Sequence, residues 1–214
     1  MTPTIQLTNK PAIAIYAIWL FHISGILGIT LGYFDWFIEK TSVNLLACLI
    51  LFFVFYPVRR PKQIATFLVF FLGGLFAEWL GVHYGILFGD YSYGSNLGLK
   101  IDGVPLLIGT YWGLLTFVTA GILDFTKWNN GFKIGIGAAL MVILDFFMEK
   151  NAPIFDFWTF EGNGAPIQNY MTWYFIALLF HGILRIVKIE GNRVFALHIY
   201  LAQLLFFVFF YFKY

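Results

Sequence analysis

Seven apolar stretches, each near the length that crosses a membrane, are the feature that most restricts how this chain can fold. They occupy residues 12–34, 43–58, 64–88, 103–123, 131–148, 170–187 and 194–212. A helix needs about 20 apolar residues to cross ~30 Å of hydrocarbon, and only the second and fifth stretches are short. Hydrophobic residues form 60% of the chain and charged residues 11%, which excludes an ordinary soluble domain. We predict an all-α polytopic bundle of about seven transmembrane helices in one integral membrane domain, residues 1–214.

The basic residues predict the orientation of this bundle. If the N-terminus is cytoplasmic, the cytoplasmic side carries Lys10, Arg59, Arg60, Lys62, Lys127, Lys133, Arg185, Lys188 and Arg193, and the outside carries Lys40, Lys100, Lys150 and Lys213. Cytoplasmic loops of membrane proteins carry an excess of Lys and Arg. We therefore predict an N-in, C-out topology, and we expect the protein in the bacterial cytoplasmic membrane.

Three acidic residues lie within or at the end of apolar stretches. A carboxylate deep in hydrocarbon costs about 3 kcal/mol, so it normally faces the bundle interior or a wet cavity. Glu78 and Asp145 each follow the cytoplasmic start of their stretch by 14 residues, which is about 21 Å along a helix. Glu149 lies four residues after Asp145, on the same helical face. We predict that the three carboxyl groups share one buried chamber toward the outer side.

Two connecting segments differ from ordinary loops. Residues 89–102 contain turn formers and two tyrosines, and Pro105 follows near the first turn of the fourth apolar stretch. The 21 residues from Glu149 to Asn169 form a segment longer than most loops in compact proteins. We interpret this second segment as a lid over the chamber.

The sequence offers no recognisable site for a metal or a cofactor. Its four histidines show no HxxH or ExxH spacing for a di-iron centre. It also has no DDxxD-like segment, and the last apolar stretch contains no lysine before Lys213 for a retinal Schiff base. The single cysteine, Cys48, has no partner for a disulfide, and a net charge of +2 does not suggest a nucleic-acid partner. We expect no metal, no cofactor and no nucleic acid.

Acid–base chemistry on an apolar substrate remains. A carboxyl group in a desolvated pocket is protonated near neutral pH, whereas one in a more polar setting stays ionised. Protonation of an isolated alkene gives a tertiary carbocation, which needs a nearly dry site with negative or π-rich walls. The aromatic residues that we expect to form such walls are Tyr91, Tyr93, Tyr111, Trp112, Trp158 and Trp173.

Three blocks of sequence resemble the integral-membrane carotenoid hydratases, a family that includes the bisanhydrobacterioruberin hydratases. The blocks are EWLGVHYGILFGDYSYGSNLGLKIDGVPLLIGTYW (78–112), LDFFMEKNAPIFDFW (144–158) and APIQNYMTWYF (165–175). Members of that family need no cofactor and add water across the terminal C1,C2 double bond of a linear carotenoid end group, giving a tertiary 1-hydroxyl. The resemblance implies this activity here, on a linear carotenoid that enters from the lipid bilayer.

The positions that match the family blocks are Glu78, Asp90, Tyr91, Asp145, Glu149, Asp156, Trp158, Asn169 and Trp173. Our hypothesis is that either Asp145 or Glu78 protonates C2 and that the other of the two deprotonates the incoming water. Asn169 and Tyr91 would position that water. The remaining catalytic candidates are Glu149, Asp90 and Asp156, and the remaining substrate-binding candidates are Tyr93, Trp112, Trp158, Trp173 and His83.

Two other functions remain open from the sequence. A related carotenoid or isoprenoid cyclase or isomerase would use the same protonation but would lose a proton instead of capturing water. A proton-coupled transporter belongs to a different class and would use intramembrane acids and histidines as a relay. It predicts an aqueous route through both leaflets, lined by Glu78, His181 and His22.

Overall fold

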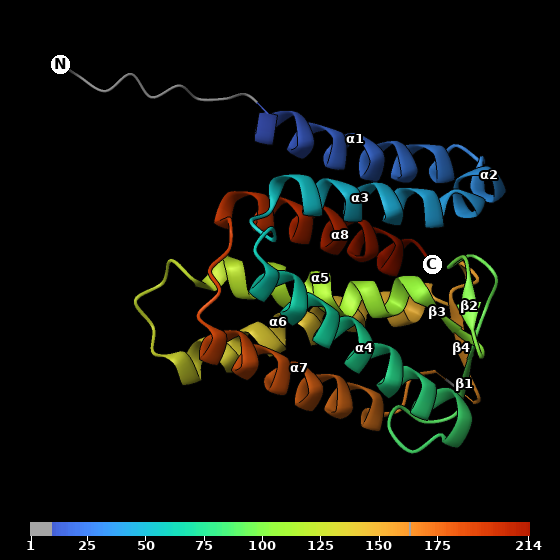
Figure 1. The fold of residues 1–214 in the computed structure, drawn as a ribbon. Coiled ribbons are helices and arrows are strands. Elements are labelled where there is room, and N and C mark those ends of the chain that lie inside the picture. Colours follow the sequence, from blue (N-terminus) through green and yellow to red (C-terminus); the bar gives the residue numbers. More distant parts are fainter. Residues whose placement is uncertain (1–9, 163) are drawn as a thin grey trace.

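The computed structural model describes residues 10–162 and 164–214, and in these residues it contains eight helices and four short strands (Figure 1). The helices are α1 (Lys10–Thr30), α2 (Phe34–Glu39), α3 (Thr41–Phe55), α4 (Pro61–Tyr84), α5 (Leu106–Leu123), α6 (Asn130–Asn151), α7 (Ile167–Val187) and α8 (Arg193–Lys213). The strands are β1 (Tyr91–Tyr93), β2 (Lys100–Ile101), β3 (Val104–Pro105) and β4 (Trp158–Phe160). The predicted all-α fold is confirmed, with small strands added.

Six of the described helices are long and apolar enough to cross a membrane, namely α1, α4, α5, α6, α7 and α8. Helix α3 is apolar but has only 15 residues. The seven predicted stretches correspond to these seven helices. The third stretch was expected to continue to residue 88, but α4 ends at Tyr84 because Gly85 adopts a left-handed conformation with φ +62°. The first stretch likewise ends at Thr30, and its predicted end is replaced by a turn before α2.

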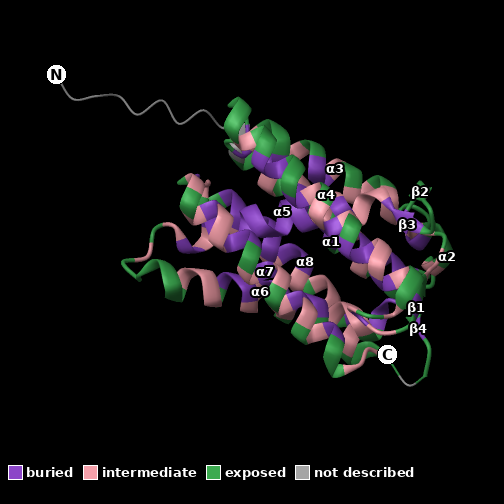
Figure 2. Ribbon diagram, turned by 60° about the horizontal axis from the view of Figure 1, so that its bottom comes forward, coloured by how far each residue is buried: buried purple, intermediate pink, exposed green. Residues whose placement is uncertain are grey.

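Helix α5 lies at the centre of the bundle (Figure 2). In its span 67% of the residues are buried, against 28–39% in the other five long helices. It packs most closely against α4, where Gly74 faces the ring of Trp112, and a Cβ atom at residue 74 would lie 2.5 Å from that ring. The glycine therefore lets the two helix backbones approach each other.

All four strands lie at one end of the bundle, together with α2 and the C-terminus (Figure 1). We call this the sheet end. Strand β1 pairs with β4 in antiparallel orientation, so that Tyr91 lies opposite Phe160 and Tyr93 opposite Trp158. The segments interpreted as a connector and a lid thus pair with each other instead of being separate loops.

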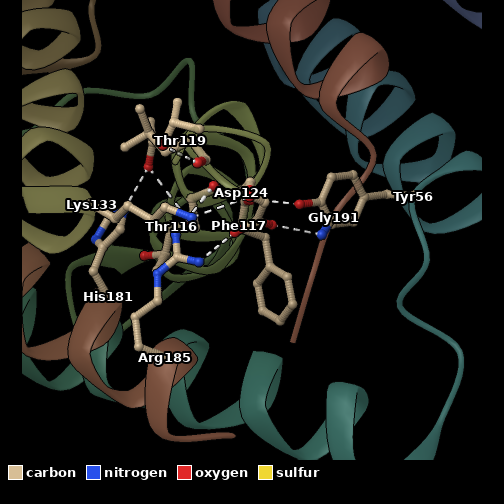
Figure 3. Close-up of polar contacts among 12 residues, drawn as sticks. Tyr56, Thr116, Phe117, Thr119, Asp124, Lys133, His181, Arg185 and Gly191 are labelled. Atoms are coloured by element: carbon tan, nitrogen blue, oxygen red, sulfur yellow. Dashed lines mark hydrogen bonds and ion pairs between the residues drawn. The ribbon is translucent and has the colours of Figure 1, made fainter. Parts of the chain in front are cut away.

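The opposite end of the bundle is closed by a network of polar contacts (Figure 3). Arg185 of α7 donates to the carboxylate of Asp124 at the end of α5, and the backbone N–H of Gly191 donates to the other Asp124 oxygen at 2.8 Å. The hydroxyl of Tyr56 donates to the carbonyl oxygen of Phe117 at 2.6 Å. These contacts tie the ends of α3, α5 and α7 to the α7–α8 connection.

Candidate active site

A cavity of about 450 Å³ lies at the sheet end and is lined by residues from all eight described helices and from β1 and β4. Glu78 of α4 and Asp145 and Glu149 of α6 all line it. Two remote stretches of sequence therefore bring their carboxyl groups to one chamber, as their equal depth along α4 and α6 predicts. The exposed fractions of Glu78 and Asp145 are 3% and 1%, so both acids are enclosed by protein.

Glu78 accepts hydrogen bonds from three neutral donors. Its Oε2 atom accepts from the hydroxyls of Tyr91 at 2.5 Å and Tyr93 at 2.7 Å, and its Oε1 atom accepts from the indole N–H of Trp112 at 2.9 Å. Burial, followed by the charge of Glu78, raises the pKa of both Tyr91 and Tyr93, so both phenols keep the protons that they donate. Glu78 is therefore surrounded by hydrogen-bond donors, none of which carries a positive charge.

The short β1–β4 sheet explains how these donors reach the acids. Alternate residues of a strand point to the same face, and the burial of Tyr91 in β1 and of Trp158 and Phe160 in β4 marks the face toward the cavity. Tyr93 and Trp158 are direct cross-strand neighbours. Tyr93 donates to Glu78, and Trp158 donates through its indole N–H to Glu149 Oε2 at 2.9 Å. One strand pair thus holds donors for acids on two different helices.

Asn169 of α7 joins the two acids of α6. Its side-chain nitrogen donates to Asp145 Oδ2 at 3.0 Å and to Glu149 Oε1 at 2.9 Å. The two carboxyl groups are therefore immediate neighbours. Asp145 Oδ1 is buried and has no hydrogen-bond partner among the described residues, whereas both oxygens of Glu149 accept a hydrogen bond.

Stacked indole rings form one wall beside Glu78. The rings of Trp112 and Trp173 lie 3.8 Å apart between centroids, with an angle of 15° between their planes. Trp173 lines the cavity, whereas Trp112 is fully buried behind it and is not among the lining residues. The structure therefore places Trp112 as a hydrogen-bond donor to Glu78 and not in the position of a substrate contact.

Eight of the predicted site residues line this one cavity, and they are Glu78, Tyr91, Tyr93, Asp145, Glu149, Trp158, Asn169 and Trp173. The structure does not bring Asp90, His83 or Asp156 to it. Asp90 is exposed in the turn after α4, where its carboxylate lies against Gly85. His83 is also exposed, and its Nε2 atom lies 3.2 Å from Asp102. Their positions in a turn and at the end of a helix explain why they carry polar side chains.

Asp156 has a structural position next to the β1–β4 pair. It is exposed, with φ +53°, and its carboxylate accepts hydrogen bonds from the hydroxyl and the backbone N–H of Ser95. These bonds lower the pKa of Asp156. In the same turn, the N–H of Gly94 donates to the carbonyl oxygen of Phe157 at 2.8 Å. Asp156 thus fastens the two segments that carry Tyr93 and Trp158.

Some polar residues of the cavity were not predicted from the sequence. Asn44 of α3 and Gln203 of α8 line it, although they lie far from the three sequence blocks. His22 of α1 also lines it, and the sequence suggested this residue only for the route of a transporter. Asn44 and Gln203 are uncharged polar residues inside apolar helices, and this was the available signal. The prediction concentrated on carboxyl groups and so assigned the first, second and last helices no part in the site.

His181 lies outside the cavity lining. Its Nδ1 atom contacts the carbonyl oxygen of Ala177 at 2.8 Å, and its Nε2 atom contacts the hydroxyl of Thr119 at 2.9 Å (Figure 3). Helix α6 leaves room for the ring at Gly137, where a side chain would collide with it. The buried ring is held by its neighbours, and this arrangement does not place it beside Glu78 as a proton relay requires.

Among the described residues, no group of three or more His, Cys, Asp or Glu side chains is arranged to hold a metal ion.

The family model described as carotenoid biosynthesis protein matches residues 40–213 of the chain. The chain belongs to the carotenoid biosynthesis protein family. No curated protein and no solved structure matches it significantly.

The match to the carotenoid biosynthesis protein family covers every residue of the acidic part of the cavity. It includes α3 to α8 and all four strands, and it leaves out α1 and α2. These two helices nevertheless supply part of the cavity wall, for example Phe21 and Trp36. Membership of this family indicates an enzyme of carotenoid biosynthesis, and the six long apolar helices indicate a protein that is integral to a membrane.

Proposed function

We propose that this protein is a cofactor-independent carotenoid hydratase of the bacterial cytoplasmic membrane that adds water across the terminal C1,C2 double bond of a linear carotenoid. The observation that carries this proposal is the meeting of Glu78, Asp145 and Glu149 in one largely apolar cavity, with neutral hydrogen-bond donors around them. Membership of the carotenoid biosynthesis family supports the substrate class.

The Asp145–Glu149 pair is the proton donor in this proposal. Two carboxyl groups that share one donor in a desolvated site keep a proton between them, because two adjacent negative charges repel each other. Glu149 has a donor for each oxygen, whereas Asp145 Oδ1 has none. The proton therefore resides on Asp145, which transfers it to C2 of the alkene and leaves a tertiary carbocation at C1.

Glu78 is the anionic group and the base. Its three donors satisfy three of the roughly four lone-pair positions of a carboxylate, which leaves one for water. The carboxylate and the Trp173 ring stabilise the cation at C1. Water adds to C1 and gives a proton to Glu78, and a second water in the cavity returns that proton to Asp145. The product gains hydrogen at C2 and hydroxyl at C1, and the enzyme recovers its starting state.

The donors first assigned to water have other partners. Asn169 donates to two carboxyl groups and Tyr91 donates to Glu78. Both residues are therefore positioning residues for the acids in the present proposal. The incoming water is held by the remaining lone-pair position of Glu78.

Expression in a lycopene-producing bacterium, followed by mass spectrometry of the pigments, tests the reaction. A hydratase adds the mass of one water for each end that reacts. A cyclase or isomerase leaves the mass unchanged, and this result would replace the proposed reaction with one of those. Normal turnover by both Asp145→Asn and Glu78→Gln would contradict the acid–base assignment.

A further inference from the structure

The cavity reaches the surface beside the first three helices. Among the lining residues that the structure describes, only four are exposed: Phe21, Trp36, Lys40 and Val43. The exposed fractions are 40% for Phe21, 58% for Trp36 and 64% for Val43. All four lie in α1, in α2, directly after α2, or near the start of α3. We call these four residues the mouth.

Small residues line the passage behind the mouth. Ser24 comes from α1, and Thr41 and Ala47 come from α3. Small side chains on two facing helices leave space between them. The passage therefore runs through the α1–α3 seam, which is a side of the bundle, toward the buried acids.

Beyond the acids, the bundle is filled toward its opposite end. Helix α5 is buried without interruption from Trp112 to Gly121, and the Tyr56–Phe117 contact and the Asp124–Arg185 pair close the space beyond it (Figure 3). A chain that enters at the mouth meets the acids with its leading end and is not threaded through the protein.

We propose that the mouth admits one end of a linear, acyclic carotenoid from the lipid, while the rest of the polyene stays outside the cavity along the α1–α3 seam. This inference rests on the proposed hydratase function. An extended carotenoid is about as long as the hydrocarbon core is thick, ~30 Å, whereas neighbouring helices are only about 8–10 Å apart. The cavity holds the reacting end group, and the three apolar residues of the mouth contact the adjoining part of the chain.

One mouth and one set of acids mean that the two ends of a symmetrical carotenoid react in separate binding events. The singly hydrated pigment leaves through the mouth and must turn around before its second end reaches Asp145. The enzyme therefore releases the singly hydrated product as a free intermediate.

A bulky substitution in the opening tests the mouth. Val43→Trp places a large ring there, and Leu179→Trp is the control because Leu179 is exposed on α7, away from the α1–α3 seam, and does not line the cavity. Both are made in an Asp145→Asn background, in which bound pigment is measured by absorbance without turnover. We expect Val43→Trp to reduce bound carotenoid by about tenfold, which corresponds to about 1.4 kcal/mol, and Leu179→Trp to leave it unchanged.

Widening the mouth should have the opposite effect on the loading of pigment. Phe21→Ala should load pigment at least as fast as the parent protein. Equal melting temperatures of Val43→Trp and the parent protein would show that the loss of pigment in Val43→Trp is obstruction and not misfolding. Equal amounts of bound pigment in Val43→Trp and Leu179→Trp would contradict the proposed mouth. If the binding pattern is as expected but wild-type protein makes no hydrated product, the binding site stands and the proposed reaction fails.

A time course tests release between the two ends. With substrate in excess, the singly hydrated pigment should dominate early samples, and the doubly hydrated pigment should appear only after a lag. If doubly hydrated pigment were the main early product, the proposal that the two ends react in separate binding events would be wrong.

Discussion

At the end opposite the sheets, the buried carboxylate of Asp124 is paired with Arg185, whereas at the sheet end Glu78, Asp145 and Glu149 have no basic partner among the described residues. Asp124 also accepts from the backbone of Gly191. A paired and hydrogen-bonded charge is fixed in one protonation state, and its contribution is to hold helix ends together. Carboxyl groups that have only neutral donors can still exchange protons, and this difference separates the chemical end of the molecule from its structural end.

Asp145→Asn should have the largest effect on activity. It removes the proton that the pair holds, and loss of a general acid typically lowers the rate by about 10²–10⁴-fold. Helix α6 should still fold, because Asn is similar in shape and can accept the Asn169 hydrogen bond. Hydrated pigment per unit of membrane-inserted protein is the measurement, with Asp35→Asn as an exposed acid-to-amide control. Turnover within a factor of about two of wild type would show that Asp145 is as structural as Asp124.

Arg185→Met should instead lower stability. It leaves the Asp124 carboxylate buried without its cation, which typically costs about 3–5 kcal/mol. Thermal unfolding in detergent measures this loss, and activity per folded molecule should stay near that of wild type at low temperature. The double variant Asp124→Asn with Arg185→Met should recover much of the stability. A pair that is unimportant for folding would instead give single and double variants with the same melting temperature.

The sequence predicted some features of the fold and of the sheet end, but not others. The apolar stretches predicted the seven main helices, and the equal depth of Glu78 and Asp145 predicted their common chamber. The strands were missed because each has only two or three residues, and β1 is formed by pairing with residues more than 60 positions away. Entry of the substrate from the bilayer was expected, but the residues of the mouth were not predicted, because Phe21, Trp36 and Val43 have the same character as residues on a lipid-facing surface.

Trp158→Phe tests one neutral donor to the acids of the sheet end. Phenylalanine retains an aromatic ring in the cavity wall but loses the N–H that donates to Glu149. We expect turnover to fall by about tenfold, since a hydrogen bond to a charged group contributes about 1.5–3 kcal/mol and some of it is replaced by water. Assays of initial rate over a range of pH measure both the loss and any displacement of the optimum. Phe157→Tyr is the control for a nearby aromatic change; an equal loss in both variants would indicate general damage to the β4 segment.

Asp156→Asn should have the smallest effect, which appears as a change in the pH dependence of stability. Hydrogen bonds from Ser95 lower the pKa of Asp156 in the folded protein, so the charged form stabilises the fold. That contribution is present above the unfolded pKa of about 3.9 and is lost as the pH falls through the lower folded value. The melting temperature of wild type should exceed that of Asp156→Asn slightly at neutral pH, and the two should converge below about pH 4. Asp156 is exposed and lies outside the cavity, so turnover per folded molecule should stay near that of wild type. A large fall in turnover would assign Asp156 a chemical role. It would then weaken the distinction between carboxyl groups that react and carboxyl groups that hold the β1–β4 pair and the rest of the fold together.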